Sequence, residues 1–216
     1  MNKLIIAVDG PAASGKGTLA RKLAARFGFE YLDTGKLYRL IGLQLLNADK
    51  NPDDEVQAGE QAKELARYFR LSDLDNPDLS RDDVGNYASR AAVHVSVRES
   101  LIDLQRAFPD QVDSKGVVID GRDIGTVIFP DADLKFYVTA ELGVRAKRRY
   151  EELKSAGRQA DYDEIYQDME QRDARDSGRE HAPTRKAEDA IELDTSDMSV
   201  DQMVEKVTPY ILRVSR

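Results

Sequence analysis

The stretch GPAASGKGT at residues 10–18 decides the fold of this chain. The apolar run LIIAV at residues 4–8 precedes it, and a helical pattern follows, with Leu19, Leu23 and Phe27 on one face. A strand, a glycine-bounded loop and a helix in this order form a cradle for phosphate. Loop N–H groups point inward, the helix N-terminus adds partial positive charge and a lysine adds a full charge. We therefore predict a phosphate-binding loop; the alternative is an ordinary strand–turn–helix junction rich in small residues.

The hydroxyl of this loop stands one position later than usual. In the common form of the motif, Ser or Thr follows the lysine directly. Here Gly17 intervenes, and Thr18 carries the hydroxyl. The ending G-K-G-T is similar to that of nucleoside monophosphate kinases.

Length and composition exclude several classes of protein. The chain has 216 residues, a net charge of −8 and no cysteine. One domain is expected, and the chain is long enough to bury a core. The negative charge disfavours nucleic-acid binding, and the lack of cysteine excludes disulfides and thiolate catalysis. With no apolar run near the about 18 residues of a membrane span and no signal-peptide pattern, we expect a cytoplasmic protein without a membrane partner.

Strand and helix patterns alternate along most of the chain. Strands separated by helices predict an α/β fold, with a parallel sheet covered on both faces. The expected strands span residues 4–8, 29–32, 117–119, 134–138 and 190–193. The expected helices span residues 17–27, 37–46, 97–108, 142–154, 162–175 and 200–213. Ser199, with Gln202 three residues on, predicts a capping box for the last helix.

Residues 47–96 depart from this alternation. Acidic and polar residues dominate its first part, a helix is expected up to Arg67, and the segment 68–71 looks like a short strand. Residues 73–78 have turn chemistry. We interpret the region as a lobe inserted into the parallel core.

The carboxylate of Asp120 directly follows the predicted strand 117–119. In proteins with a phosphate loop, an Asp at such a position binds Mg²⁺ directly or through water, although any buried strand can end in Asp by chance. Arg122 and Asp123 come next and are expected at the edge where open α/β sheets bind ligands. They can hold a phosphate and a hydrogen-bond donor of a substrate, or they can form a mutual surface ion pair.

Two further groups of residues can bind anions. Thr34 and Arg39 can bracket a second anion, with Tyr38 as a wall for a base, or Asp33-Thr34-Gly35 is only a helix cap. Positively charged stripes lie at Arg145, Arg148 and Arg149 and at Arg172, Arg175 and Arg179, the latter with Asp173 and Asp176. Arginines stabilise the charge that spreads in phosphoryl transfer. The alternative is i,i+3 and i,i+4 ion pairs on a solvated helix.

Three isolated residues are given no catalytic part on sequence grounds. His94 and His181 lack a ligand pattern and are interpreted as structural or surface residues. Arg98, considered alone, is interpreted as a surface charge.

Together these motifs resemble the bacterial cytidylate kinase family over nearly the whole chain. The matching segments are VDGP at 8–11, GKGT at 15–18, LDTG at 32–35, Tyr38-Arg39, VRE at 97–99, DGRDIGT at 120–126, FPDA at 129–132, and Arg172-Asp173 through Asp176. Lys36 stands where many relatives carry a small residue, and it either adds charge near the acceptor site or faces solvent.

The resemblance implies transfer of the γ-phosphoryl group of ATP to CMP or dCMP, with Mg²⁺. The expected catalytic residues are Lys16, Arg122, Arg172 and Arg175. The expected ATP-binding residues are Gly10, Pro11, Ala12, Ala13, Ser14, Gly15, Lys16, Gly17 and Thr18. The expected acceptor-binding residues are Thr34, Tyr38, Arg39, Ser89, Arg98, Arg122, Asp123, Asp176 and Arg179, the last two near the sugar. The expected Mg²⁺ ligands are Thr18 and Asp120, directly or through water.

The resemblance also implies a single kinase unit, residues 1–216, with a P-loop NTPase-type core and two smaller parts. The core covers about 1–35, 97–150 and 182–216, the acceptor-binding insert about 36–96, and a short mobile lid about 151–181. A monomer in pyrimidine nucleotide metabolism is expected.

The expected chemistry is in-line transfer without a covalent enzyme intermediate. The acceptor phosphate is already deprotonated at neutral pH, so positioning and charge neutralisation suffice. The alternatives are a P-loop kinase for UMP, AMP, dTMP or shikimate, and a nucleotide-dependent switch without catalysis.

Overall fold

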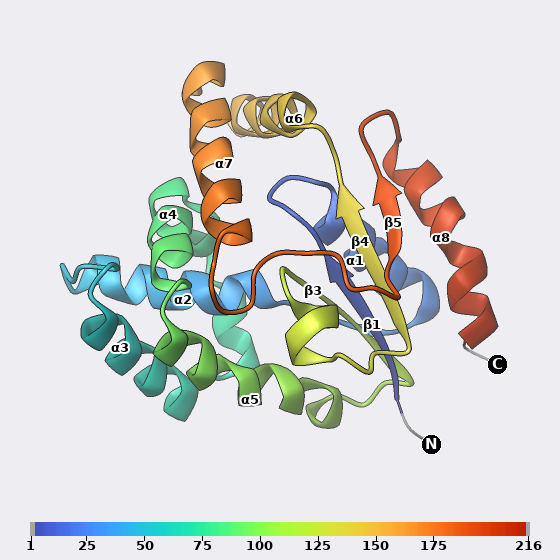
Figure 1. Cartoon of the computed structure of the whole chain (residues 1–216), viewed down its shortest axis with the longest axis horizontal. Helices are drawn as coiled ribbons and strands as arrows, with labels where there is room; N and C mark the ends of the chain where they lie inside the picture. The colour runs from blue at the N-terminus through green and yellow to red at the C-terminus, as the bar shows by residue number, and fades with distance from the viewer. Residues whose placement is uncertain (1–2, 215–216) are drawn as a thin grey trace. The chain divides into compact units, whose positions relative to one another are not determined.

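A computed structural model describes residues 3–214 of the chain (Figure 1). It divides into two compact units, one made of residues 1–32 and 112–216 and the other of residues 33–111. Met1, Asn2, Ser215 and Arg216, which the predicted core includes, lie outside the described residues.

The first unit contains a five-stranded parallel sheet in the order β2-β3-β1-β4-β5. The strands are β1 (Leu4–Asp9), β2 (Glu30–Asp33), β3 (Gly116–Gly121), β4 (Leu134–Thr139) and β5 (Ile191–Asp194). β1 pairs with β3 and with β4, and β4 pairs with β5. In the ladder Val8 lies opposite Asp120. The phosphate loop therefore starts beside the carboxyl end of β3.

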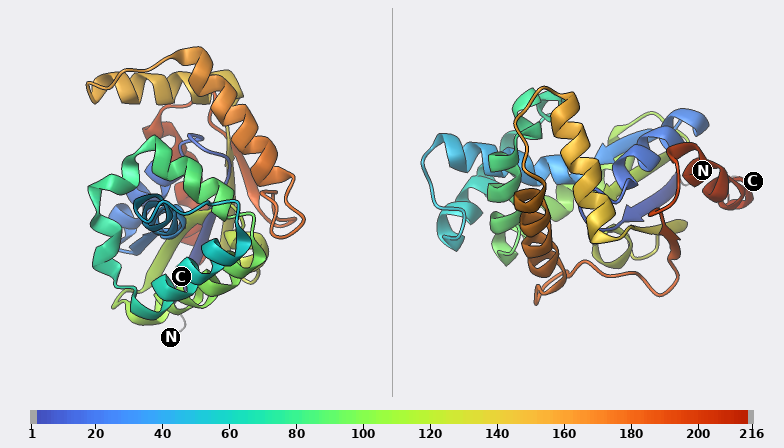
Figure 2. Two further views of the ribbon diagram at one scale, coloured as in Figure 1. Left: turned by 90° about the vertical axis from the view of Figure 1, so that its left-hand side faces the viewer. Right: turned by 90° about the horizontal axis from the view of Figure 1, so that it is seen from above.

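Helices complete the first unit. They are α1 (Lys16–Phe27), α6 (Leu142–Ser155), α7 (Tyr162–Ser177), α8 (Val200–Val214) and the π-helical turn η3 (Ile124–Ile128). Apolar residues of α1 and α8, among them Leu19, Leu23 and Val207, join inward-facing strand residues such as Val8 and Phe136 in one core cluster. These two helices thus cover one face of the sheet. Helices α6 and α7 pack against each other, as two further views show (Figure 2).

The second unit is helical throughout. Its elements are α2 (Thr34–Asn47), α3 (Glu55–Tyr68), η1 (Leu71–Asp75), η2 (Pro77–Ser80), α4 (Asp82–Ala91) and α5 (Val95–Gln111). A Cβ at Gly42 would lie 2.7 Å from both the Ala88 nitrogen and the Val84 carbonyl oxygen. Only glycine at this position lets the backbones of α2 and α4 approach so closely.

The structure confirms the predicted α/β class and the strands and helices expected in the alternating part of the chain, with ends displaced by at most three residues. The capping box of α8 is present, since the Ser199 N–H donates to the Gln202 side chain and the Gln202 N–H donates to the Ser199 hydroxyl.

The expected strand at 68–71 is wrong. Tyr68 ends α3 and Leu71 begins η1, and both side chains are exposed, so neither contributes to a sheet. The Arg70 N–H donates to the Asp73 carboxylate at 2.8 Å, and this contact closes a 3-10 turn instead. The sequence predicts no helix at residues 82–91, where the structure has α4, although Val84, Ala88 and Ala91 follow a helical spacing.

The second unit is also longer than the insert expected at 36–96. Helix α5 belongs to it, because Val97 and Leu101 lie in the same core cluster as Ala58 and Leu65 of α3.

Candidate functional site

The phosphate loop lies between β1 and α1, and glycines set its backbone. Gly10 has a φ of 151°, and a Cβ there would lie 1.9 Å from the Val138 carbonyl oxygen. Gly15 has a φ of 89° and precedes the first residue of α1. As far as residues 3–214 show, no side chain caps this helix and no acidic residue occupies its first turn. The N-terminus of α1 therefore presents backbone N–H groups of the kind that bind anions.

Side chains from later in the chain hold two carbonyl groups of the loop. Arg145 on α6 donates to the Ala12 carbonyl at 3.2 Å. The fully buried Thr195 has its hydroxyl 2.8 Å from the Ser14 carbonyl, and it accepts from Arg148 at 3.0 Å. These bonds preorganise the loop. The Ser14 hydroxyl itself is buried and has no hydrogen-bond partner in the described part of the chain, as expected of a donor that a bound phosphate would satisfy.

Lys16 and Asp120 face each other at the base of the loop. The Lys16 Nζ lies 4.0 Å from Asp120 Oδ2, and the Asp120 side chain is only 4% exposed. The Tyr31 hydroxyl donates to Asp120 Oδ1 at 2.9 Å and fixes the carboxylate. A Cβ at Gly17 would lie 3.3 Å from Asp120 Oδ2 and 3.5 Å from the Tyr31 hydroxyl. A larger residue after the lysine would crowd this carboxylate, which gives the unusual G-K-G-T ending a physical reason.

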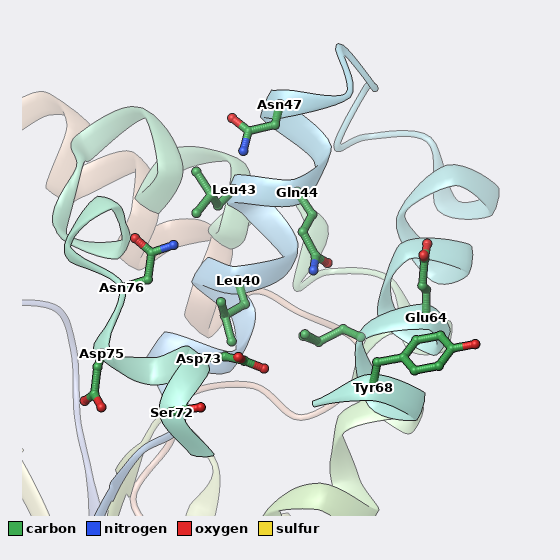
Figure 3. Close-up of a pocket in the computed structure, with 11 residues that line it drawn as sticks. Leu40, Leu43, Gln44, Asn47, Glu64, Tyr68, Ser72, Asp73, Asp75 and Asn76 are labelled. Atoms are coloured by element: carbon green, nitrogen blue, oxygen red, sulfur yellow. The ribbon is translucent and has the colours of Figure 1, made fainter. Parts of the chain in front are cut away.

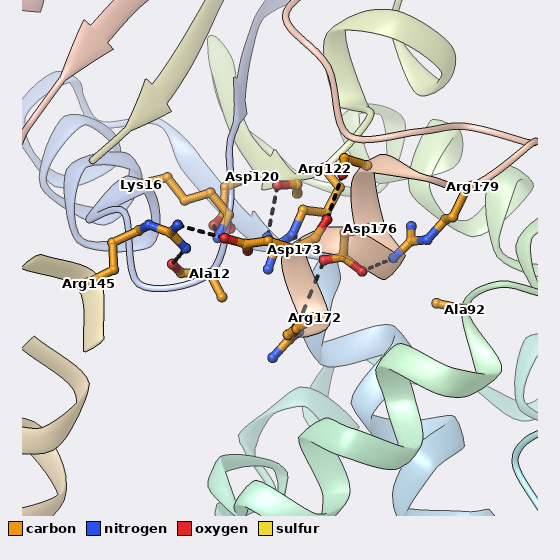
Figure 4. Close-up of polar contacts among 12 residues, drawn as sticks. Ala12, Lys16, Ala92, Asp120, Arg122, Arg145, Arg172, Asp173, Asp176 and Arg179 are labelled. Atoms are coloured by element: carbon orange, nitrogen blue, oxygen red, sulfur yellow. Dashed lines mark hydrogen bonds and ion pairs between the residues drawn. The ribbon is translucent and has the colours of Figure 1, made fainter. Parts of the chain in front are cut away.

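A second set of arginines surrounds Asp176 on α7 (Figure 4). Arg122, which follows β3, donates to this carboxylate at 3.0 Å, Arg179 also binds it, and the Arg172 Nε lies 3.9 Å away. Burial alone would raise the pKa of Asp176, but the charges of Arg122, Arg179 and Arg172 outweigh burial and hold that pKa below its usual range. The i,i+3 and i,i+4 pairs named as the alternative thus exist, but they surround a buried carboxylate that also binds Arg122, directly after β3.

Of the other arginines in these stripes, two form ion pairs and one has a buried nitrogen without a hydrogen-bond partner among the described residues. Arg145 binds Asp173 at 2.6 Å, and Arg149 pairs with Glu152 at 2.9 Å. The buried Nε of Arg175 has no hydrogen-bond partner within residues 3–214. Arg175 is therefore equipped to take up an anion.

The predicted acceptor residues of the second unit occupy α2, α4 and α5. Tyr38 and Arg98 come together, with the guanidinium 5.5 Å from the ring centroid. Arg98 is 6% exposed and donates to the Ala92 carbonyl at 3.4 Å, so its interpretation as a surface charge is wrong. Thr34 is buried in the first turn of α2. Ser89 is buried, and its hydroxyl lacks a hydrogen-bond partner among the described residues.

Arg39 and Lys36 both bind backbone carbonyls of the 71–81 segment. Arg39 donates to the carbonyls of Leu79 at 2.7 Å and Arg81 at 2.9 Å. Lys36 donates to the Leu74 carbonyl at 2.7 Å. Neither expectation for Lys36 describes this contact, in which the lysine fastens the start of α2 to η1.

The second unit also contains a pocket of about 690 Å³ (Figure 3). It lies among α2, α3 and η1, and its lining includes Leu43, Gln44, Glu64, Tyr68 and Asp73. No predicted site residue lines it.

The two histidines have the structural or surface positions expected of them. The His94 ring nitrogen lies 3.0 Å from the Pro52 carbonyl oxygen, and His181 is exposed. Sequence reasoning missed three residues that shape the first unit, namely Asp9, Tyr31 and Thr195. Only Asp9 had a signal, since it lies in the VDGP segment. No helix within the described residues is long and apolar enough to cross a membrane.

Two solved structures share the fold at low sequence identity. An uncharacterized protein from Eubacterium ventriosum superposes with a TM-score of 0.53 at 16% identity, covering 97% of this chain and 98% of that one. TT1252 from Thermus thermophilus has a TM-score of 0.52 at 16% identity, covering 99% and 98%. At this identity the likeness concerns the fold alone.

Sequence comparisons are more specific. The family model described as cytidylate kinase matches residues 6–213. The cytidylate kinase of Caulobacter sp. (strain K31) is 50% identical over 198 residues, which cover 92% of this chain and 89% of that protein. The cytidylate kinase of Rhizobium meliloti (strain 1021) is 49% identical over 197 residues, which cover 91% and 90%. The chain therefore belongs to the cytidylate kinase family of nucleoside monophosphate kinases.

Proposed function

We propose that this protein transfers the γ-phosphoryl group of ATP to CMP or dCMP and releases ADP with CDP or dCDP. Membership of the family supports the donor and the acceptor. The observation that best supports phosphoryl transfer is the set of arginines around Asp176. A protein that only binds a nucleotide at the phosphate loop has no need of this second buried set of cations in the same unit.

On the donor side, residues 10–18 hold the ATP phosphates. The N–H groups at the start of α1 and the unpartnered Ser14 hydroxyl bind phosphate oxygens, and Lys16 neutralises charge on the transferring group. Because Arg145 and Thr195 already hold two carbonyls of the loop, little reorganisation accompanies binding.

Thr18 and Asp120 suit a Mg²⁺ ion that ATP brings. A hydroxyl and a carboxylate are hard oxygen donors, and Mg²⁺ on nucleotides commonly takes only one or two protein ligands beside phosphates and water. The buried Asp120 is held in place by Tyr31 and balanced by Lys16, so it is oriented before any ligand binds. When bound, the ion would neutralise charge on the phosphates.

For the acceptor, the first unit supplies Arg122, Asp123, Asp176 and Arg179. Arg122 binds the acceptor phosphate, Asp123 accepts a hydrogen bond from the cytosine amine, and Asp176 and Arg179 bind the sugar. On the second unit, we assign acceptor binding to Thr34, Tyr38, Arg39, Ser89 and Arg98.

Residues 151–181 form the lid in this account. Arg172 and Arg175 on α7 bind the transferring phosphoryl group, and closure excludes water from it. The acceptor oxygen is already ionised, so no side chain needs to remove a proton. Alignment of the two phosphates and neutralisation of their charge account for the catalysis.

Three further assignments complete the proposal. We infer that the protein is a monomer and that it is cytoplasmic. We also place its reaction in pyrimidine nucleotide metabolism, where other reactions supply CMP and consume CDP.

Coupled ADP release with Mg-ATP tests the function, using CMP, dCMP, UMP, AMP, dTMP and shikimate as acceptors. We expect turnover confined mainly to CMP and dCMP. Turnover with another acceptor would replace the assigned substrate. If folded protein binds ATP but releases no ADP with any acceptor, the result would favour the nucleotide-dependent switch.

A further inference from the structure

Asp9 is a buried carboxylate to which the proposed reaction assigns no part. It is the last residue of β1, immediately before Gly10, and it is 5% exposed. Its Oδ1 accepts from the Ile124 N–H at 2.8 Å, and its Oδ2 accepts from the Gly125 N–H at 2.7 Å. One carboxylate thus holds two successive backbone donors of a distant turn.

That turn directly follows Arg122 and Asp123. Its backbone is also packed against the Lys135 side chain, because a Cβ at Gly125 would lie 3.0 Å from Lys135 Cδ and 3.4 Å from Asp9 Oδ2. The backbone at Gly125 is therefore clamped between β4 and the end of β1. Movement of this backbone would change the positions of the two preceding side chains.

We propose that Asp9 is a positioning residue for the acceptor. Its carboxylate fixes the backbone that carries Arg122 and Asp123 and ties that backbone to the strand that leads into the phosphate loop. The inference rests on the proposed function, which assigns Arg122 and Asp123 to the acceptor.

The surroundings of Asp9 also predict when this clamp works. Burial raises the pKa of Asp9 to about 6, the N–H groups of Gly125 and Ile124 oppose that rise, Asp123 adds to it and Arg122 opposes it. Tyr137 on β4 also interacts electrostatically with Asp9, and Lys135 on the same strand packs against Gly125. At pH 8 the carboxylate is ionised and accepts both N–H groups. In the protonated form, the added O–H presents a donor toward them.

The first test compares Asp9→Asn with Asp133→Asn at pH 8. Asp133 provides a matched control, because its exposed carboxylate also accepts from a backbone N–H of a distant element, that of Ile5 on β1 at 2.8 Å. In Asp9→Asn the amide accepts from only one N–H and turns a donor toward the other. Losing one charge-assisted hydrogen bond predicts a KM for CMP raised about tenfold or more, with the Kd for ATP unchanged within about twofold. Asp133→Asn should match the unmodified protein in both constants.

Equal loss of ATP and CMP binding in Asp9→Asn would show a general structural defect and overturn the proposal. An unchanged KM for CMP would overturn it too. Should Asp9→Asn fail to fold, Gly125→Ala disturbs the same contact from the other side. It should raise the KM for CMP selectively as well, and unchanged kinetics in that variant would count against the clamp.

A second measurement does not depend on turnover. Amide proton shifts of Ile124 and Gly125, followed by NMR from pH 5 to pH 8, should titrate together with a midpoint near pH 6. They should not titrate in Asp9→Asn. If no acceptor is phosphorylated, the proposed function fails, but these amide shifts and direct CMP binding still test the role of Asp9. Amide shifts that do not change with pH, or that titrate equally in Asp9→Asn, would contradict that role.

Discussion

Replacing Asp9 by Asn should change how the stability of this protein depends on pH. The pKa of Asp9 rises from 3.8 to about 6 on folding, chiefly because the carboxylate is buried. Since the folded pKa lies above the unfolded one, the native state binds the proton more tightly. The resulting stabilisation is fully present below pH 3.8 and is lost as the pH rises through about 6.

The size of this effect follows from the shift. About two pKa units correspond to about 3 kcal/mol at neutral pH, since each unit is worth about 1.36 kcal/mol. At pH 4.5 the unmodified protein has lost only about 1 kcal/mol of this stabilisation, because the pH is then only a little above the unfolded pKa of 3.8. Between pH 4.5 and pH 7.5, the free energy of unfolding of Asp9→Asn should therefore gain about 2 kcal/mol relative to the unmodified protein.

Urea unfolding at the two pH values measures this difference. Circular dichroism and tyrosine fluorescence should be recorded together, because coincident transitions are needed to apply a two-state analysis to a chain of two units. Contributions of the other titrating groups are shared by both proteins and cancel in the comparison. A stability difference that stays constant with pH, or that shifts in favour of the unmodified protein at pH 7.5, would refute the reasoning.

Three other substitutions test the site. Lys16→Met should lower kcat about a hundredfold or more while leaving the fold intact, since the positive charge beside the transferring phosphoryl group is lost; near-normal turnover would contradict the role of this lysine. Gly10→Ala should cost about 3 kcal/mol or more of stability, because its Cβ would lie 1.9 Å from the Val138 carbonyl oxygen; an unfolding curve like that of the unmodified protein would show that the loop relaxes freely. Asp176→Asn should cost about 3–5 kcal/mol of stability, because it leaves buried arginines without their carboxylate. A smaller loss in the last variant would mean that water or another group already satisfies these arginines.

The sequence predicts the first unit well, because its signals are local. The strand–loop–helix order at residues 4–27, the apolar strands and the Ser199 capping box each depend on neighbouring residues. The second unit was predicted less well, because its elements depend on one another. Of the residues that helix α4 buries, only Val84, Ala88 and Ala91 carry apolar side chains. The 68–71 segment has strand-like composition but closes into a 3-10 turn through Asp73.

Candidate residues within motifs could be located, but their partners could not. Nothing local shows that Arg122 reaches Asp176, 54 residues later, or that Tyr31 donates to Asp120 on the neighbouring strand. The burial of Arg98 could not be predicted from the sequence either, because the charge of a residue does not show which helices pack around it.

The most direct test of the central claim is a ³¹P NMR spectrum of the protein with Mg-ATP and CMP. Our account predicts that resonances of ADP and CDP grow in equal amounts, that inorganic phosphate stays at its starting level, and that Lys16→Met produces neither. Growth of inorganic phosphate without CDP, or no change in ATP while both nucleotides bind, would contradict phosphoryl transfer to CMP.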